Sequence, residues 1–409
     1  MKKSNLKLLA LVLFMLASVL GMISNSHAKK SHGAAAAIST DGLEQTSTSS
    51  SNLPSLATVR LQQGDKPAEQ VRKNIQVLKG LPDSQVIPVM KFMAASLGVN
   101  CAFCHVNTGG NWEFEKDDKP TKITARKMML MQFGINKDNK DMFGGTGGIT
   151  CYTCHRGHTE PQVMPVLPLT APAGEAAKAA EPLPTTDQVL EKYIQAIGGK
   201  AAYEKLKNRS MKGTQILADG TSIPLETYQA SPDKVTSILT TPKQGVMLSG
   251  YNGKVGWVKN QRGQRELSGG QLAQMKRAAD FYGDLKLKEI YPGLEIVDRE
   301  KVGDRDAYVL AAQTAPNRIE KLYFDAQTGL LLRIVTITQT MLASIPEQTD
   351  FEDYREVDGV KLPFTYRQSY IDARDGWTRK YTEIKHNVAL DDSKFNPPPP
   401  PPAATPTPK

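Results

Sequence analysis

Cysteine and histidine are scarce in this chain of 409 residues, which contains four of the first and six of the second. Its basic residues give a net charge of +9 but form no long basic block, and this argues against a nucleic-acid partner. Beyond the N-terminal region, no apolar run is long enough to cross a membrane. No cysteine follows the N-terminal apolar run, and this excludes lipid attachment there.

The N-terminus has the pattern of an export signal. Three lysines precede an apolar run from Leu8 to Ile23, and the small residues Ser26 and Ala28 flank a cleavage point. These features predict a signal peptide over residues 1–28. An uncleaved membrane anchor is the alternative, although the run is shorter than the roughly 20 apolar residues that span a bilayer. We therefore expect a periplasmic or other extracytoplasmic location, with membrane association left open.

All four cysteines occur in two copies of the pattern C-x-x-C-H, CAFCH at 101–105 and CYTCH at 151–155. In this pattern two thiols add to the vinyl groups of one porphyrin, and the adjacent histidine reaches the iron as its proximal ligand. Such attachment takes place outside the cytoplasm, in agreement with the predicted signal peptide. The motifs predict two covalently bound c-type haems. The attaching cysteines are Cys101, Cys104, Cys151 and Cys154, and the proximal iron ligands are His105 and His155.

Two other uses of the cysteines explain the sequence less well. A zinc site with four cysteine ligands has the right number of thiols, but it leaves both adjacent histidines unexplained and places thiolates in an oxidising compartment. Two redox-active disulfides would need a strand and a helix around each C-x-x-C, and neither motif has that frame.

Few histidines remain to act as the second axial ligand of either iron. His27 and His32 lie in the N-terminal region, His158 lies just past a proximal ligand, and His386 is far along the chain. Methionine is then the natural sixth ligand, which raises the reduction potential of the haem. This set of residues favours an electron carrier over the alternative, a two-haem peroxidase with one open iron. The chain is therefore expected not to be an enzyme.

Methionine-rich segments with helical spacing precede both motifs. In DSQVIPVMKFMAASLG, the apolar residues Met90 and Met93 share one face; Asp83 or Ser84 is expected to cap the helix, and Gly98 to end it. Periodicity alone favours a core position for both methionines. Before the second motif, the candidates Met128, Met129 and Met131 cannot be separated by spacing.

A resemblance to a known family is carried by three stretches: KNIQVLKGLPDSQVIPVMKFMAASLGVNCAFCH, ARKMMLMQFGIN and ITCYTCHRG. Over about residues 68–165 the chain resembles the cytochrome c subunit family of photosynthetic reaction centres. In that family a helix with an axial methionine and a turn precede a short helix that bears C-x-x-C-H. The resemblance implies Met90 as the ligand of the first haem. For the second haem it implies Met128, with Met129 and Met131 as alternatives.

The chain also departs from this family. Its members usually carry four haems and a lipid-bearing cysteine, whereas this sequence has two motifs and no such cysteine. The loop NKDNKDMFGGTGG lacks the histidine that serves one haem in the family. The resemblance thus implies a two-haem relative whose partners are redox proteins: other cytochromes, a membrane oxidoreductase or a reaction centre. Arg126 and Arg156 are candidates to pair with haem propionates.

Composition divides the chain into further segments after the signal peptide. We predict a disordered low-complexity segment at 29–66, a mainly α two-haem domain at 67–165 and a Pro/Ala linker at 166–185. An antiparallel β-rich domain at 186–395 and a Pro-rich tail at 396–409 complete this multidomain architecture.

The β-rich domain is predicted from short alternating runs joined by Asp-Gly, Asn-Gly and Thr-Gly turns. Thr186 is expected to cap a first helix that ends at Gly198, and GGQLAQMKRAADFYGDLKL is expected to form one more helix. This order weakly resembles the periplasmic lipoprotein-carrier fold, a curved sheet with a few helices over an apolar cavity, and it implies a hydrophobic ligand as a hypothesis. Trp257 is expected in the sheet core. The acids Asp350, Glu352, Asp353 and Glu356 are assigned to turns, and no catalytic group of residues is found.

Overall fold

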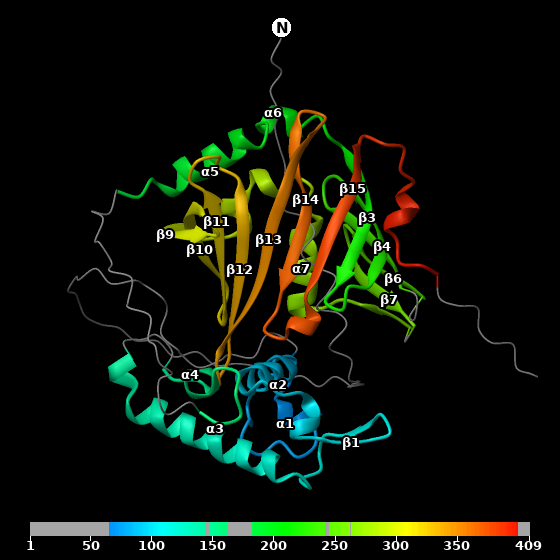
Figure 1. Cartoon of the computed structure of the whole chain (residues 1–409). Helices are drawn as coiled ribbons and strands as arrows, with labels where there is room; N and C mark the ends of the chain where they lie inside the picture. The colour runs from blue at the N-terminus through cyan, green and yellow to red at the C-terminus, as the bar shows by residue number, and fades with distance from the viewer. Residues whose placement is uncertain (1–64, 144–147, 162–181, 242–244, 262, 400–409) are drawn as a thin grey trace, which may run out of the picture.

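The computed structural model describes residues 65–143, 148–161, 182–241, 245–261 and 263–399. The predicted signal peptide lies outside these residues, as do most of the low-complexity segment and the linker and the end of the Pro-rich tail. The described chain forms a helical part, drawn in blue and cyan in Figure 1, and a large sheet that follows it. Within the described residues, no helix is both long and apolar enough to span a membrane.

The helical part contains four α-helices, two short 3-10 helices and one small hairpin. In chain order these are α1 (Ala68–Val71), α2 (Asp83–Leu97), η2 (Cys101–Phe103), β1 (Val106–Thr108), β2 (Asn111–Glu113), α3 (Pro120–Asp138), η3 (Lys140–Phe143) and α4 (Cys151–His155).

Helix α2 ends as predicted but begins differently. Gly98 adopts a left-handed conformation with φ +66° and closes the helix, which confirms the predicted end. The expected cap at Asp83 or Ser84 is wrong, because Pro82 precedes the helix and supplies no side-chain acceptor. The carboxylate of Asp83 instead lies in the first turn and forms an ion pair with Arg72, where negative charge is also favourable to the helix dipole.

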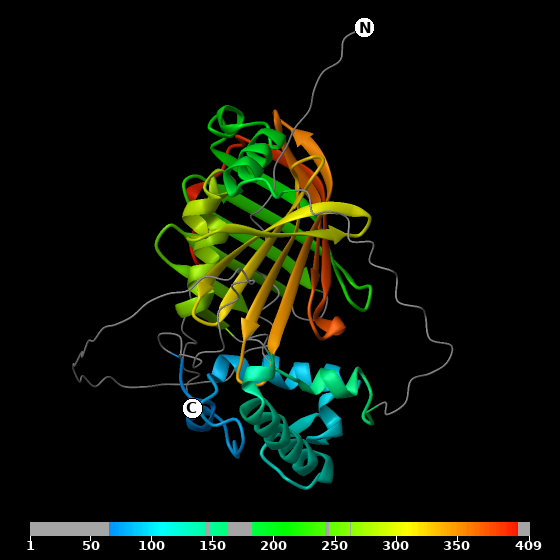
Figure 2. The ribbon, with the colours of Figure 1, turned by 90° about the vertical axis from the view of Figure 1, so that its left-hand side faces the viewer.

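The sheet contains thirteen antiparallel strands within the described residues and is not closed. Its order is β8-β7-β6-β5-β4-β3-β15-β14-β13-β12-β11-β10-β9, so the last strand pairs with the first and the two edge strands, β8 and β9, are consecutive in the chain. Figure 2 shows that the sheet is strongly twisted and curved. The bounds are β3 (Asn208–Leu217), β4 (Ser222–Ala230), β5 (Lys234–Thr241), β6 (Gly245–Asn252), β7 (Gly256–Asn260), β8 (Gly263–Glu266), β9 (Glu295–Val302), β10 (Arg305–Ala315), β11 (Arg318–Asp325), β12 (Leu331–Gln339), β13 (Ser344–Val357), β14 (Val360–Ser369) and β15 (Trp377–His386).

Short helices accompany this sheet: α5 (Thr186–Ala196), α6 (Lys200–Tyr203), α7 (Gly269–Ala279), η4 (Gly283–Leu285), α8 (Leu287–Ile290), η5 (Ala373–Asp375) and η6 (Asp392–Phe395). The expected cap at Thr186 is wrong by one residue, because Thr185 forms a capping box with Gln188. The second predicted helix is interrupted after Ala279, since Asp280 has an extended backbone and its carboxylate accepts a hydrogen bond from the Tyr282 amide, 3.1 Å away.

The main core lies between the sheet and these helices. Tyr193, Ile197 and Tyr203 from the α5–α6 region pack against apolar side chains of both halves of the sheet. Trp257 is 1% exposed, which confirms its predicted place in the core. A cavity of about 300 Å³ lies between α5 and the η4–α8 segment, and its wall includes both apolar and charged side chains. The hydrophobic ligand expected from the sequence therefore stays a prediction.

The four acids assigned to turns lie on strand β13 instead. Asp350 is buried and pairs with Arg333, with 2.6 Å between Oδ1 and Nε, across the β12–β13 pair. The sequence favours a solvated turn here because the partner of a charged residue on an adjacent strand is not known until the register of the sheet is known.

The turn between β12 and β13 joins the sheet to the helical part. Leu342, Ala343 and Ile345 are buried in one apolar cluster with side chains of α2, including Val89 and Phe92. Figures 1 and 2 both place this end of the sheet directly over α2 and α4. The helical part and the sheet therefore share an apolar interface.

Candidate haem-attachment site

The first motif occupies the 3-10 helix η2 and the residues that follow. The side chain of Asn100 begins this helix by accepting a hydrogen bond from the Ala102 amide, 3.0 Å away. The ring of His105 meets the ring of Phe114 edge-on, with centroids 5.1 Å apart. Its Nδ1 is buried and has no hydrogen-bond partner in the described part of the chain. Burial also lowers the pKa of His105 below its usual value, which favours the neutral ring that a metal ligand requires.

The second motif forms helix α4. Thr150 and Thr153 exchange hydrogen bonds in a capping box at its start, which fixes the beginning of the motif. The Nδ1 of His155 lies 3.0 Å from the carbonyl oxygen of His158. When Nδ1 carries the proton, it donates a hydrogen bond to this carbonyl. The lone pair of Nε2 is then free to bind a metal.

The two motifs border the same cavity, which has a volume of about 200 Å³. The cysteines Cys104, Cys151 and Cys154 and the ring of His155 line it, together with residues of α2 and α3. None of the four motif cysteines forms a disulfide in the structure. Burial raises the pKa of both Cys104 and Cys151. Three thiols, the His155 imidazole and several thioethers thus surround one apolar cavity, and they fit the donor set that covalent haem requires. The other predicted site residues, Cys101, His105 and Met90, do not line this cavity.

The methionines before the motifs have different surroundings. Met90 is half-buried and packs against the apolar cluster of α2, while Met93 lines the cavity. On α3, Met128 is 42% exposed, Met131 is 53% exposed and Met129 is 5% exposed, and all three contribute to the cavity wall. Met129 is also a member of the apolar cluster with α2. These environments were not available from spacing, which treats the three neighbouring methionines alike.

Two polar residues of α3 fix the segment that leads into the second motif. Asn136 Oδ1 accepts from the Ile149 amide at 2.8 Å, and Asn136 Nδ2 donates to the Ile149 carbonyl at 2.9 Å. Gln132 donates to the same carbonyl at 3.1 Å. Met128, Gln132 and Asn136 follow one another at intervals of four residues, so they share one face of the helix. Neither polar residue is among the site residues predicted from the sequence, although their spacing from Met128 could have indicated them.

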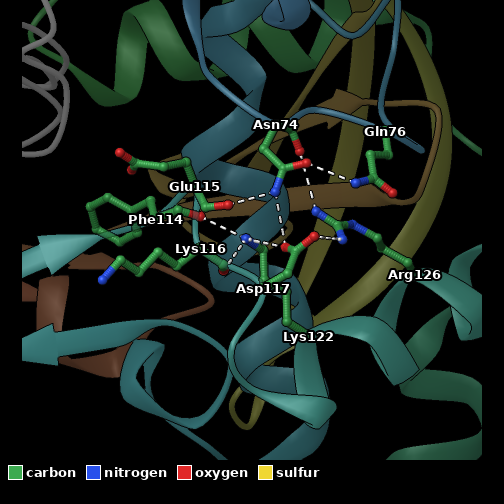
Figure 3. A network of polar contacts seen from close by, with 8 residues as sticks. All are labelled: Asn74, Gln76, Phe114, Glu115, Lys116, Asp117, Lys122 and Arg126. Carbon is green, nitrogen blue, oxygen red and sulfur yellow. Dashed lines mark hydrogen bonds and ion pairs between the residues drawn. The ribbon is translucent and has the colours of Figure 1, made fainter.

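The first motif is supported by a network of polar contacts around Asp117, shown in Figure 3. This carboxylate accepts from Lys122 at 2.9 Å, Arg126 at 2.8 Å and Asn74 at 3.0 Å. These hydrogen bonds hold the pKa of Asp117 well below its usual range. Lys122 also donates to the Phe114 carbonyl at 2.8 Å, which holds the backbone of the residue whose ring contacts His105. Arg126, a predicted partner of haem propionates, is thus engaged with Asp117.

Gly98 allows the end of α2 to approach the second motif. A Cβ atom on Gly98 would lie 2.0 Å from the Gly157 carbonyl oxygen, and the Gly157 amide donates to the Ser96 carbonyl at 2.9 Å. Replacing Gly98 by alanine is therefore expected to reduce the free energy of unfolding by at least about 2 kcal/mol. A left-handed alanine costs about 1 kcal/mol, and moving the Gly157 backbone away from the new Cβ atom costs more. Urea titration followed by circular dichroism measures the change. Gly80→Ala is the control, because Gly80 also has positive φ but no atom within 4 Å of its Cβ position.

Comparisons with known proteins agree with the motifs. Residues 24–182 match the model of the family described as the photosynthetic reaction centre cytochrome C subunit, and this segment contains both C-x-x-C-H motifs. The chain is similar to that family over these residues, and the family is one of electron-transfer proteins. No curated protein sequence matches the chain.

Solved structures similar to this chain include a DUF1329 family protein from Desulfovibrio piger, with 12% identity, a TM-score of 0.38, and coverage of 51% of this chain and 96% of that one. A LolA superfamily protein from Nitrosomonas europaea has 15% identity and a TM-score of 0.37, with coverage of 53% and 99%. Similarity at this level says nothing of a shared ligand or activity.

Proposed function

We propose that this chain is an exported c-type cytochrome that carries two covalent haems and transfers electrons between redox proteins. The observation that carries the proposal is the single cavity bordered by both C-x-x-C-H motifs and by methionines of α2 and α3. Haem supplies reversible one-electron chemistry at its iron. The match of residues 24–182 to an electron-transfer family supports the same function.

In this proposal the residues of the chain have separate roles. Cys101 and Cys104 bind the first haem, and Cys151 and Cys154 bind the second. His105 and His155 are the proximal iron ligands, and the hydrogen bond from His155 to the His158 carbonyl orients the second ring. Met90 and Met128 would supply the second axial ligands of the two irons. Both methionines belong to a haem-bearing domain at 67–165, which precedes the β-rich domain at 186–395. The surrounding apolar side chains exclude water and so help to raise the reduction potentials.

The location and the partners follow from the N-terminal pattern and from the covalent attachment of haem. The N-terminal pattern at residues 1–28 directs export, and covalent attachment of haem requires an extracytoplasmic compartment. Partners are then periplasmic or membrane-bound redox proteins. A reaction centre is one of these partners only if the host has one. The expected absence of enzymatic activity depends on both irons having six ligands.

A spectroscopic experiment tests this function. The protein is purified from a host that matures c-type cytochromes, and covalent haem is counted as the pyridine haemochrome after acid–acetone extraction of free haem. We expect two haems per chain, low-spin spectra, and the near-infrared band of iron–methionine ligation in the oxidised form. A high-spin component with rapid peroxide turnover would instead support the two-haem peroxidase. A protein without covalent haem would contradict both functions.

A further inference from the structure

One buried hydrogen-bond group connects the sheet with the second motif. Gln132 on α3 is 4% exposed, and its Nε2 donates to two carbonyl oxygens, that of Ile149 at 3.1 Å and that of Leu342 at 2.8 Å. Leu342 lies in the β12–β13 turn, 210 residues further along the chain. The Oε1 atom of the same amide lies 3.9 Å from the Sγ of Cys151. A single side chain thus contacts the sheet, the segment before the motif, and the first cysteine of the motif.

The turn that Gln132 contacts is itself well defined. The hydroxyl of Thr340 accepts from the amides of Leu342 and Ala343 at 3.2 and 3.0 Å, and it donates to the Ala343 carbonyl at 2.7 Å. Thr340 and Leu342 are both buried. The Leu342 carbonyl is therefore presented to Gln132 by a turn with one fixed conformation rather than by a free loop.

We propose that Gln132 is a positioning residue through which the C-terminal sheet sets the position of the second haem-attachment motif. Both hydrogens of its amide are used, so a shift of the turn moves the amide, and a shift of the amide moves Ile149, two residues before Cys151. A buried amide that loses a hydrogen-bond partner is costly, so the two hydrogen bonds of Gln132 favour one arrangement of these three segments. This inference rests on the proposed function, because the motif has a role only if it binds haem.

A second polar contact between the same two parts of the chain provides a control. Lys91 on α2 forms an ion pair with Asp375 of η5, on the loop between β14 and β15. Both side chains are about one third exposed, and among the described residues no hydrogen bond or ion pair joins either of them to the second motif. Asp375→Asn removes this ion pair while it preserves the size of the side chain. It therefore weakens the same interface without affecting Gln132.

The test compares Gln132→Leu, Thr340→Val, the double variant and Asp375→Asn in the full chain. Hydrogen exchange of residues 148–155 is measured by mass spectrometry, and the midpoint potentials of both haems are measured by spectroelectrochemical titration. We expect exchange of this segment to become about tenfold faster in Gln132→Leu and in Thr340→Val, with one of the two midpoint potentials shifted. The double variant is expected to exchange no faster than the single variants, because both remove the same connection. Asp375→Asn is expected to match the wild type in both measurements.

The proposal is overturned if Thr340→Val leaves both the exchange and the potentials unchanged, since Gln132 would then act only within the helical part. It is also overturned if Asp375→Asn has the same effect as Gln132→Leu, because any weakening of the interface would then suffice. The exchange experiment does not depend on haem. A chain that binds no haem would therefore contradict the proposed function, whereas the exchange comparison would still decide whether the sheet positions this segment.

Discussion

Replacing Met128 by leucine is expected to remove the iron–methionine band of one haem and to leave that of the other, so that the near-infrared intensity falls by about half. The reduction potential of the affected haem falls as well, because the thioether raises it. Stability changes little, since Met128 is well exposed and leucine is similar in volume. Near-infrared absorption, potentiometry and urea titration of the same preparation measure the three quantities.

The two neighbouring methionines are the matched controls. Met129→Ala is expected to cost about 2–5 kcal/mol of the free energy of unfolding while it keeps the full band, because Met129 fills the cluster with α2. Met131→Leu is expected to change neither property. If the band is instead lost in Met131→Leu and kept in Met128→Leu, the assignment of the sixth ligand to Met128 is wrong. If both Met128→Leu and Met131→Leu keep the full band, neither methionine is a ligand.

Replacing Asp284 by asparagine is expected to stabilise the sheet domain above neutral pH. Asp284 is buried and accepts hydrogen bonds from the hydroxyls of Tyr193, at 2.7 Å, and Tyr203, at 3.1 Å. Burial raises the pKa of Asp284 from 3.8 to about 7 in spite of these hydrogen bonds. An asparagine has a similar shape and carries no charge to desolvate, so it avoids the penalty that the aspartate meets when it ionises.

The sign of the pH dependence follows from the direction of this shift. Because the pKa of Asp284 is higher in the folded state, its contribution is fully present below pH 3.8 and is lost as the pH rises through about 7. The wild type is therefore expected to lose up to about 4 kcal/mol relative to Asp284→Asn between pH 4 and pH 8. Urea titrations at several pH values measure this difference. Asp187→Asn is the control, because Asp187 is an exposed acid that lines the same cavity as Asp284, the one between α5 and the η4–α8 segment. The plot of stability against pH for Asp187→Asn should parallel that of the wild type.

The effect of Asp284 has to be measured as the difference in stability between the wild type and Asp284→Asn. The stability of the wild type alone also depends on His386, whose titration has the opposite effect in part of the same pH range. Burial lowers the pKa of His386 from 6.5 to about 4, so its contribution to stability is present above pH 6.5 and is lost as the pH falls. The curve of the wild type alone is thus flattened between pH 4 and pH 6.5. Parallel curves for the wild type and Asp284→Asn would show that Asp284 does not titrate as expected.

Local sequence patterns predicted most elements but not their contacts. The end of α2 at Gly98 and the succession of short antiparallel strands could be predicted, because turn residues and periodicity depend on neighbours in the chain. The pairing of β15 with β3 could not, since it brings together the first and last strands of the sheet in chain order, which are far apart in the sequence. Asp350 shows the same limit, because a charge is recognised as buried only once its partner on the adjacent strand is in place.

The two haem-attachment sites could be predicted from the sequence, because the spacing of cysteine and histidine in C-x-x-C-H depends only on covalent neighbours. It also reduced the candidates for the second axial ligand to a few methionines. Only the tertiary structure decided that both motifs border one cavity, that Met129 packs into the core, and that Gln132 reaches the β12–β13 turn. These contacts join residues far apart in the chain, and they exist only after the sheet and helices have buried their apolar faces against each other.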